Sequence, residues 1–270
     1  MHLRDRISLF HLAAFGDWHI VAEMDASRSF VAVDSYRKAA SSDAPAAWNY
    51  KGLTIHADPR LHEHVAELVR AALPLGASVL DLAAGSGAMC LRLKDIGMRP
   101  TGTDLVAENF RLHGEVDFVT ANLNDAIPAP LRQGFDCVIA TELIEHLENP
   151  RHLIRQCHDL LKPGGLLIIS SPNTSSSISL AQFVRTGEFR WFTPLQYGND
   201  GHIMPILLPV LRYALEECRF ANIQIHSIAP LRFAGLNWWK MRLLAWLLRR
   251  VIARPLLEGD FLIAQATRPR

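Results

Sequence analysis

A glycine-rich turn between residues 79 and 89 constrains the fold more than any other feature of this chain. The stretch Val79-Leu-Asp-Leu-Ala-Ala-Gly-Ser-Gly-Ala-Met89 starts as a short apolar run, passes through Gly85-Ser-Gly87, and is followed by apolar residues at roughly helical spacing as far as Ile96. This order predicts a strand, a tight turn and a helix. Glycine lets the backbone adopt a positive φ and pass close to a ligand. In such units the ligand lies beyond the carboxyl end of the strand, so we expect a binding site here.

Two nucleotide-binding patterns compete for this turn. A dinucleotide site requires G-x-G-x-x-G, but Ala83 stands at the first glycine position and Cys90 at the third. The stretch instead resembles motif I of class I S-adenosylmethionine (SAM) methyltransferases, D/E-x-G-x-G-x-G, with Ala83 as a small departure. The resemblance implies that SAM is the cofactor. It also places the following residues in the cofactor site: Asp81, Ala83, Gly85, Ser86 and Gly87.

An acidic residue follows the second predicted strand. Asp104 comes directly after residues 99–103 and can accept hydrogen bonds from both ribose hydroxyls of a nucleoside, although a helix N-cap is the alternative. The same resemblance assigns cofactor contacts to Leu105, Asn122, Leu123 and Thr141. Asn122 departs from the acidic residue that this family usually carries near the adenine, but its amide can still form hydrogen bonds with the base.

The remaining pattern predicts an α/β domain. Strands are expected at 77–82, 99–103, 116–121, 135–140, 166–170, 223–228 and 261–266, with helices at 59–73 and 205–218 and a turn at Lys162-Pro-Gly-Gly165. The run FDxVxxxExxEHLxxP…LLKPGGxLxISxPN resembles the region after motif I in one branch of the SAM methyltransferases, and the resemblance covers roughly residues 59–228. It implies a Rossmann-like fold of seven strands in the order 3-2-1-4-5-7-6, with the seventh strand antiparallel.

Three additions to this domain are expected. Residues 1–50 form an N-terminal extension or cap, and residues 51–270 form the methyltransferase domain. Within that domain, the aromatic-rich segment 174–204, beginning with a loop at Ser175–Ser179, is a natural lid over the carboxyl ends of the strands. Residues 236–253 form a helix whose charges are all positive and which contains several tryptophans.

The candidate catalytic residues follow the fourth strand. If Thr141-Glu-Leu-Ile-Glu-His146 begins a helical turn, Glu142, Glu145 and His146 share one face, and His202 can meet them from beyond the lid. Two carboxylates and two imidazoles suit Mn, Fe, Co or Zn, and Mg is also compatible. The alternative is that the carboxylates cap a helix and the histidines pack in the core.

The E-x-x-E-H motif is similar to the metal-binding set of small-RNA 2′-O-methyltransferases and of ubiquinone-pathway O-methyltransferases, which methylate catechols. The resemblance implies a metal that chelates two neighbouring hydroxyls and acidifies one of them. We therefore expect SAM-dependent O-methylation of a small molecule or saccharide. The alternatives are a metal-independent methyltransferase in which His146 or His202 is the general base, a nicotinamide-dependent oxidoreductase, and a catalytically inactive partner protein.

Composition narrows the partners and the compartment. A net charge of +1 over 270 residues argues against a general nucleic-acid binder. The four cysteines include no C-x-x-C pair, which is typical of a reducing compartment, and we predict a cytoplasmic protein without a signal peptide or spanning helix. The basic, aromatic helix at 236–253 predicts peripheral contact with the inner face of a membrane, or else an oligomer contact or packing on the N-terminal segment.

Overall fold

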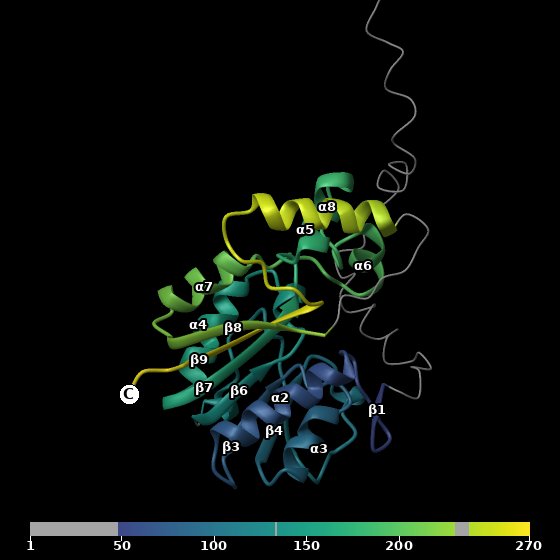
Figure 1. Cartoon of the computed structure of the whole chain (residues 1–270). Helices are drawn as coiled ribbons and strands as arrows, with labels where there is room; N and C mark the ends of the chain where they lie inside the picture. The colour runs from purple at the N-terminus through teal and green to yellow at the C-terminus, as the bar shows by residue number, and fades with distance from the viewer. Residues whose placement is uncertain (1–47, 133, 230–237) are drawn as a thin grey trace, which may run out of the picture.

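A computed structural model describes residues 48–132, 134–229 and 238–270 (Figure 1). Its centre is a seven-stranded sheet in the order β5-β4-β3-β6-β7-β9-β8, with β9 antiparallel to both neighbours. The strands are β3 (Ser78–Leu82), β4 (Arg99–Asp104), β5 (Asp117–Thr120), β6 (Phe135–Ala140), β7 (Leu161–Pro172), β8 (Ala221–Ile228) and β9 (Phe261–Thr267). The predicted methyltransferase strand order is confirmed. A separate hairpin pairs β1 (Asn49–Tyr50) with β2 (Leu53–Thr54).

Helices cover both faces of the sheet because its central strands are apolar on both sides. Within β3, Val79 packs in one hydrophobic cluster with α2 (Pro59–Ala72) and α3 (Ala88–Asp95). Its neighbours Leu80 and Leu82 pack in a second cluster with α4 (Pro150–Leu160) and α7 (Leu208–Glu217). Successive side chains in a strand point to opposite faces, so this alternation divides the core into two layers.

Capping residues explain where the helices begin. Asp58 accepts a hydrogen bond from the amide of Arg60 before α2, and Asn149 accepts one from the amide of His152 before α4. A proline occupies the first position of each of these helices, where its missing N–H costs nothing. Single 3₁₀ turns form η2 (Ala107–Asn109), η3 (Ala129–Leu131) and η4 (Ile144–His146).

The prediction of a loop at Ser175–Ser179 is wrong. Helix α5 (Ser177–Thr186) already begins there, because the Ser176 hydroxyl accepts a hydrogen bond from the Ser179 amide and caps the helix. Together with α6 (Pro194–Asn199) and α8 (Trp238–Val251), α5 lies beyond one end of the sheet (Figure 1).

The prediction of a turn at residues 162–165 is also wrong, because these residues belong to strand β7. α4 ends at Leu160 and β7 begins at Leu161, so the glycines lie inside an irregular strand whose register shifts against β6. None of the helices in the described part of the chain is long and apolar enough to cross a membrane. The predicted extension at residues 1–50 falls almost wholly outside the described residues.

Candidate functional site

A cavity of about 330 Å³ lies at the carboxyl ends of β3, β4 and β6. Its walls include Asp81, Ala83 and Gly85 from the glycine turn, Asp104 from the end of β4, and Thr141 after β6. The volume falls in the range of small-molecule and cofactor sites, and the location is the one where ligands bind in open α/β sheets.

The glycine turn has the backbone geometry that its sequence predicts. Gly85 has a φ of +53° and Gly87 a φ of +91°, both in the left-handed region. A Cβ on Gly85 would lie 2.9 Å from Cδ2 of His56, which also lines the cavity. Ala83 has a φ of +60° although it is not glycine. Strain of this kind costs on the order of 1–3 kcal/mol and is concentrated at ligand sites.

Asp104 holds the turn in place from the neighbouring strand. Its Oδ2 atom accepts a hydrogen bond from the Gly85 amide at 2.8 Å, and its Oδ1 atom accepts one from the Val106 amide at 3.0 Å. A carboxylate accepts more bonds than these two, because each oxygen offers two lone pairs. Asp104 can therefore fix the turn and still accept a hydrogen bond from a ligand in the cavity.

The structure does not bring all the predicted cofactor residues to the cavity wall. Asn122 is exposed, and its side chain bonds Asp125 and the Asn124 amide in a local turn. Ser86 donates to the carbonyl of Thr54 at 2.6 Å, which ties the glycine turn to β2. The other three predicted residues outside the wall are Gly87, Leu105 and Leu123.

Asp81 is a buried carboxyl group at the base of the cavity. Burial raises its pKa to about 7, and the charge of Asp104 acts in the same direction. The Cys90 thiol donates a hydrogen bond to Asp81 Oδ2 at 3.5 Å, which offsets part of the rise. A carboxyl group in this environment favours a positively charged ligand, since a cation would stabilise its ionised form.

Glu142 does not share a helical face with Glu145 and His146, so that prediction is wrong. Glu142 has a φ of +48°, and only Ile144–His146 form a short 3₁₀ turn. The Glu142 amide donates to the Ser170 hydroxyl, which in turn donates to Glu142 Oε1, both at 2.9 Å. This pair of bonds with β7 competes with helix formation and fixes the carboxyl group at the cavity wall.

Glu145, His146 and His202 come together beside the cavity. Each offers one ligand atom, and the three atoms lie within 4.8 Å of one another. The backbone carbonyl of Glu145 accepts hydrogen bonds from the amides of Ile203 at 3.1 Å and Met204 at 2.9 Å, which brings the segment after α6 to the site. The two imidazole rings meet edge to face, with centroids 4.9 Å apart.

Burial sets the charge state of this cluster. It raises the pKa of the Glu145 carboxyl well above its usual value, and the charge of Glu142 adds to the rise. Burial raises the pKa of Glu142 itself to about 8. It lowers the pKa of His146 to about 3 and also lowers the pKa of His202. Both imidazoles are therefore neutral at pH 7 and can bind a metal or accept a proton.

The two side-chain oxygens of Glu145 are buried acceptors without a hydrogen bond of normal geometry among the described residues. The nearby Ser171 hydroxyl nevertheless offsets part of the rise in the pKa of Glu145. Buried polar atoms almost always have a partner, so an exception of this kind indicates a missing proton donor or cation. The nearest histidine atom is His146 Nε2, 3.9 Å from Glu145 Oε1.

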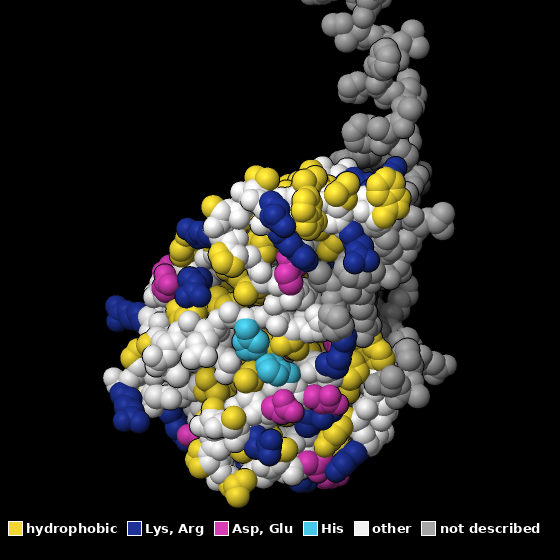
Figure 2. Space-filling view, viewed as in Figure 1, with side chains coloured by type: hydrophobic (Ala, Val, Ile, Leu, Met, Phe, Trp, Pro, Cys, Tyr) yellow, Lys and Arg dark blue, Asp and Glu magenta, His cyan; other side chains and the backbone are white. Residues whose placement is uncertain are grey.

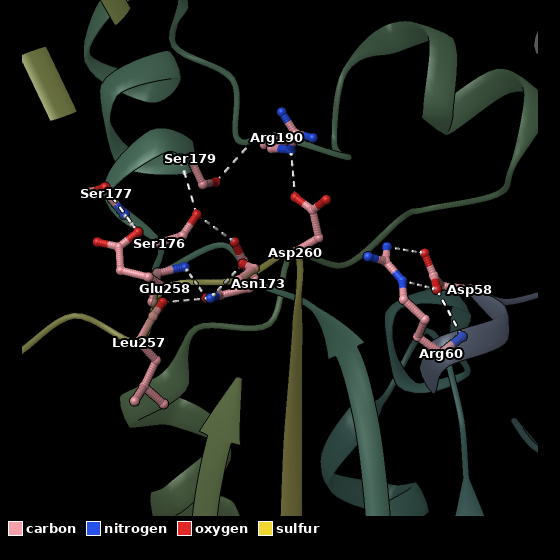
Figure 3. A network of polar contacts seen from close by, with 12 residues as sticks. Asp58, Arg60, Asn173, Ser176, Ser177, Ser179, Arg190, Leu257, Glu258 and Asp260 are labelled. Atoms are coloured by element: carbon pink, nitrogen blue, oxygen red, sulfur yellow. Dashed lines mark hydrogen bonds and ion pairs between the residues drawn. The ribbon is translucent and has the colours of Figure 1, made fainter. Parts of the chain in front are cut away.

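Sequence reasoning missed Trp191 as a site residue. Trp191 lines the cavity with a φ of +69°, and its carbonyl accepts a hydrogen bond from His202 Nδ1 at 2.7 Å. The neighbouring Arg190 points its guanidinium toward Asp260 (Figure 3), with Nε 3.1 Å from Oδ1 at an angle outside that of a hydrogen bond. The signal available in sequence was only the cluster of lid aromatics.

Comparisons with known proteins agree with this geometry. A family described as "Methyltransferase domain" matches residues 55–225. A ubiquinone biosynthesis O-methyltransferase from Xanthomonas axonopodis pv. citri is 37% identical over 40% of this chain and 48% of its own length. The chain thus spans about half the length of the curated relatives that it matches.

Two solved structures share the fold. One is a SAM-dependent methyltransferase from Archaeoglobus fulgidus, with a TM-score of 0.51 and 20% identity, covering 76% of this chain and 94% of that one. The other is phosphoethanolamine N-methyltransferase 2 from Haemonchus contortus in complex with SAM, with a TM-score of 0.54 and 14% identity over 88% of this chain and 57% of that one.

Proposed function

We propose, starting from the fact that this chain belongs to the methyltransferase-domain family and is a SAM-dependent methyltransferase, that it methylates one of two neighbouring hydroxyl groups on its acceptor. Because the chain belongs to this family, we set aside the hypothesis of a nicotinamide-dependent oxidoreductase that the sequence alone left open. The observation that carries the proposal is the meeting of Glu145, His146 and His202 beside the cavity of the glycine turn.

The first half of the proposed site holds the cofactor. SAM supplies an electrophilic methyl group on a sulfonium. The Gly85 turn allows a close approach of the backbone, and Asp104 accepts hydrogen bonds from the ribose. Asp81 lines the cavity, where its carboxyl group interacts with the positive charge of SAM. Alignment of the reacting groups is the main task of these residues, and such positioning lowers a barrier by roughly 7–11 kcal/mol.

The second half of the proposed site would hold a divalent metal. The residues fit one, because the unsatisfied oxygens of Glu145 and two neutral imidazoles form a mixed oxygen and nitrogen donor set. The three ligand atoms lie within 4.8 Å of one another, so Glu145, His146 and His202 would be the residues that hold the metal. A bound metal would acidify a coordinated hydroxyl. Glu142, held by Ser170, is the candidate fourth ligand.

The acceptor class follows from the same donor set. A metal held by only three or four protein atoms keeps open positions, which two neighbouring oxygens can fill as a chelate. The 37% identical relatives are named ubiquinone biosynthesis O-methyltransferases, which supports O-methylation. A catechol-type ring and a saccharide are the first two acceptor classes to test, and an RNA end with vicinal hydroxyls is the third.

A metal-independent mechanism has one observation in its favour. His202 Nδ1 donates to the Trp191 carbonyl, so the neutral ring carries its lone pair on Nε2. The lowered pKa of His202 keeps that atom unprotonated at pH 7, as a general base requires. In this alternative His202 removes the proton of the acceptor hydroxyl directly, and His146, with a pKa of about 3, is the weaker base of the two.

One experiment separates these mechanisms. We expect Mn²⁺ to bind the wild-type protein in a calorimetric titration and the His202→Ala variant to bind it at least about tenfold more weakly. The His64→Ala variant is the matched control, because His64 pairs with His226 away from the cavity. Methyl transfer to a catechol and to a saccharide is measured before and after chelation, and Mn²⁺ or Co²⁺ should restore the rate at least as well as Mg²⁺.

Two outcomes would contradict the proposal. Full turnover after exhaustive chelation, with no metal found by elemental analysis, would remove the metal and leave the histidine base. Transfer to amines but to no vicinal-hydroxyl acceptor would overturn O-methylation itself while leaving the methyltransferase family intact.

A further inference from the structure

Helix α8 exposes an apolar face that no other element among the described residues is shown to cover. Its inner side packs on α5 through Ala245, which is 2% exposed and contacts Ile178 and Ala181. Its outer side carries a stripe of large apolar side chains, each between 45% and 78% exposed. They are Trp239, Leu243, Trp246, Leu247 and Val251. Their spacing places them on one side of the helix, and monomeric proteins rarely expose so contiguous an apolar patch.

The charges around this stripe are all of one sign. Residues 238–251 include Lys240, Arg242, Arg249 and Arg250 but no aspartate or glutamate. Lys240 lies over the ring of Trp239 at 5.4 Å and Arg250 over that of Trp246 at 4.9 Å. The nearby carboxylate of Glu258 is already paired with Arg249 at 2.8 Å. At helical spacing Lys240 and Arg250 lie among the apolar side chains of the stripe, and Arg242 and Arg249 lie along one margin.

Helix α5, which packs against α8, also exposes apolar and basic side chains. Phe183 and Val184 of α5 are 43% and 62% exposed, and Arg185 adds a further positive charge. In Figure 2, hydrophobic and Lys/Arg side chains gather together at the end of the molecule where α5 and α8 lie in Figure 1. We call the exposed side chains of α8 together with Phe183, Val184 and Arg185 the basic apolar face.

We propose that the basic apolar face docks on a bilayer that contains anionic lipid. A helix that exposes tryptophans and leucines together with Lys and Arg, and carries no acidic residue, is of the kind that lies in a membrane interface. Long basic side chains keep their charges at the headgroups while their stems cover apolar surface. A second copy of this chain fits less well, since a symmetric contact would bring the same cations face to face.

Docking would also orient the active-site cavity. Helix α6 of the lid lies at the same end of the molecule as α5 and α8 (Figure 1), and Trp191 of the lid lines the cavity. The lid side of the molecule would then face the lipid surface, from which a membrane-dissolved acceptor could enter. This orientation does not depend on whether the acceptor is a catechol or a saccharide.

Vesicle sedimentation of the full-length protein tests the proposal. The protein should sediment with vesicles of phosphatidylcholine mixed with phosphatidylglycerol, but not with phosphatidylcholine alone. High salt should weaken the binding, because screening removes its electrostatic part. Replacing two basic side chains in K240E/R250E should weaken binding by about tenfold or more. W239S/W246S should do the same and abolish any blue shift in tryptophan fluorescence on binding.

Matched controls lie away from this face. Leu75 is an exposed apolar residue after α2, and Arg70 is an exposed cation on α2, so L75S and R70E should sediment like the wild type. Retained SAM binding shows that each variant is folded. Absence of sedimentation at low salt, or equal binding by W239S/W246S, would overturn the proposal. A dimer that W239S/W246S dissociates, without vesicle binding, would overturn it in favour of a contact between copies.

Discussion

At the scale of single residues, we predict that Asp81 makes SAM binding depend on pH. Burial raises its pKa to about 7, so below that pH the carboxyl group is protonated in the ligand-free protein. The cationic cofactor favours the carboxylate, so binding below pH 7 requires the release of a proton. We expect the affinity for SAM to fall as pH decreases, by up to about tenfold per unit between about pH 7 and 5.5.

Calorimetry in buffers of different ionisation enthalpy measures both the affinity and the proton release. The Asp81→Asn variant is the control, because it keeps the shape of the side chain but has no proton to release. Its affinity should be weaker and nearly independent of pH. A wild-type affinity that does not change over this range would contradict the role given to Asp81.

Individual residues also show what sequence patterns can and cannot predict. The turn around Gly85 was predictable because its positive φ depends on local chemistry. The conformation of Glu142 was not, because helical spacing predicted one face and the Ser170 hydroxyl, 28 residues away, imposed another. Asn122 similarly satisfies its amide within its own turn, a local bond that competes with any ligand.

At the scale of elements, the lid is held to the sheet by a buried ion pair. Arg190 and Asp260, at 13% and 1% side-chain exposure, join the segment between α5 and α6 to the start of β9. The Arg190 amide also donates to the Ser179 hydroxyl of α5 at 3.1 Å (Figure 3). These bonds position Trp191, whose carbonyl orients His202. No periodicity in the sequence pairs residues 190 and 260, so this link could not be predicted.

Breaking the pair should therefore disturb the acceptor side of the cavity more than the cofactor side. We expect Asp260→Asn to lower the free energy of unfolding by about 3–5 kcal/mol, because it leaves a buried guanidinium without its counter-charge. The KM for the acceptor should rise, while the dissociation constant of SAM should change little. Denaturant unfolding, steady-state kinetics and SAM titration give the three quantities.

The comparison for this variant is an ion pair of the same type on the surface. Arg151 pairs with Glu217, and both side chains are about half exposed, so Arg151→Met should cost at most about 1 kcal/mol and leave both constants unchanged. If Asp260→Asn weakens SAM binding as much as acceptor binding, the ion pair supports the whole fold and has no particular effect on the lid.

At the scale of the whole molecule, the sequence predicted the strands of the sheet, but not how the two groups of candidate site residues meet at one cavity. Apolar runs and glycines predicted the individual strands, because each strand and turn is encoded locally, whereas the resemblance to SAM methyltransferases supplied their order. The cofactor half comes from β3 and β4, and the second half comes from the region after β6 and the segment after α6. They line one cavity through distinct side chains, which means that two ligands should stabilise the fold independently.

Thermal unfolding can separate these contributions. A ligand that binds only the folded state at one hundred times its dissociation constant stabilises it by about 2.7 kcal/mol, or roughly 5–10 °C in Tm for a chain of this size. S-adenosylhomocysteine, the demethylated product of the cofactor, and Mn²⁺ should each raise the Tm of the wild type. Asp104→Ala should lose most of the S-adenosylhomocysteine shift and keep the Mn²⁺ shift, because Asp104 bonds the glycine turn and not the cluster of Glu145, His146 and His202. His202→Ala should keep the S-adenosylhomocysteine shift and lose most of the Mn²⁺ shift. Loss of both shifts in either variant would show that the halves are not separate, and an absent Mn²⁺ shift in the wild type would count against the metal.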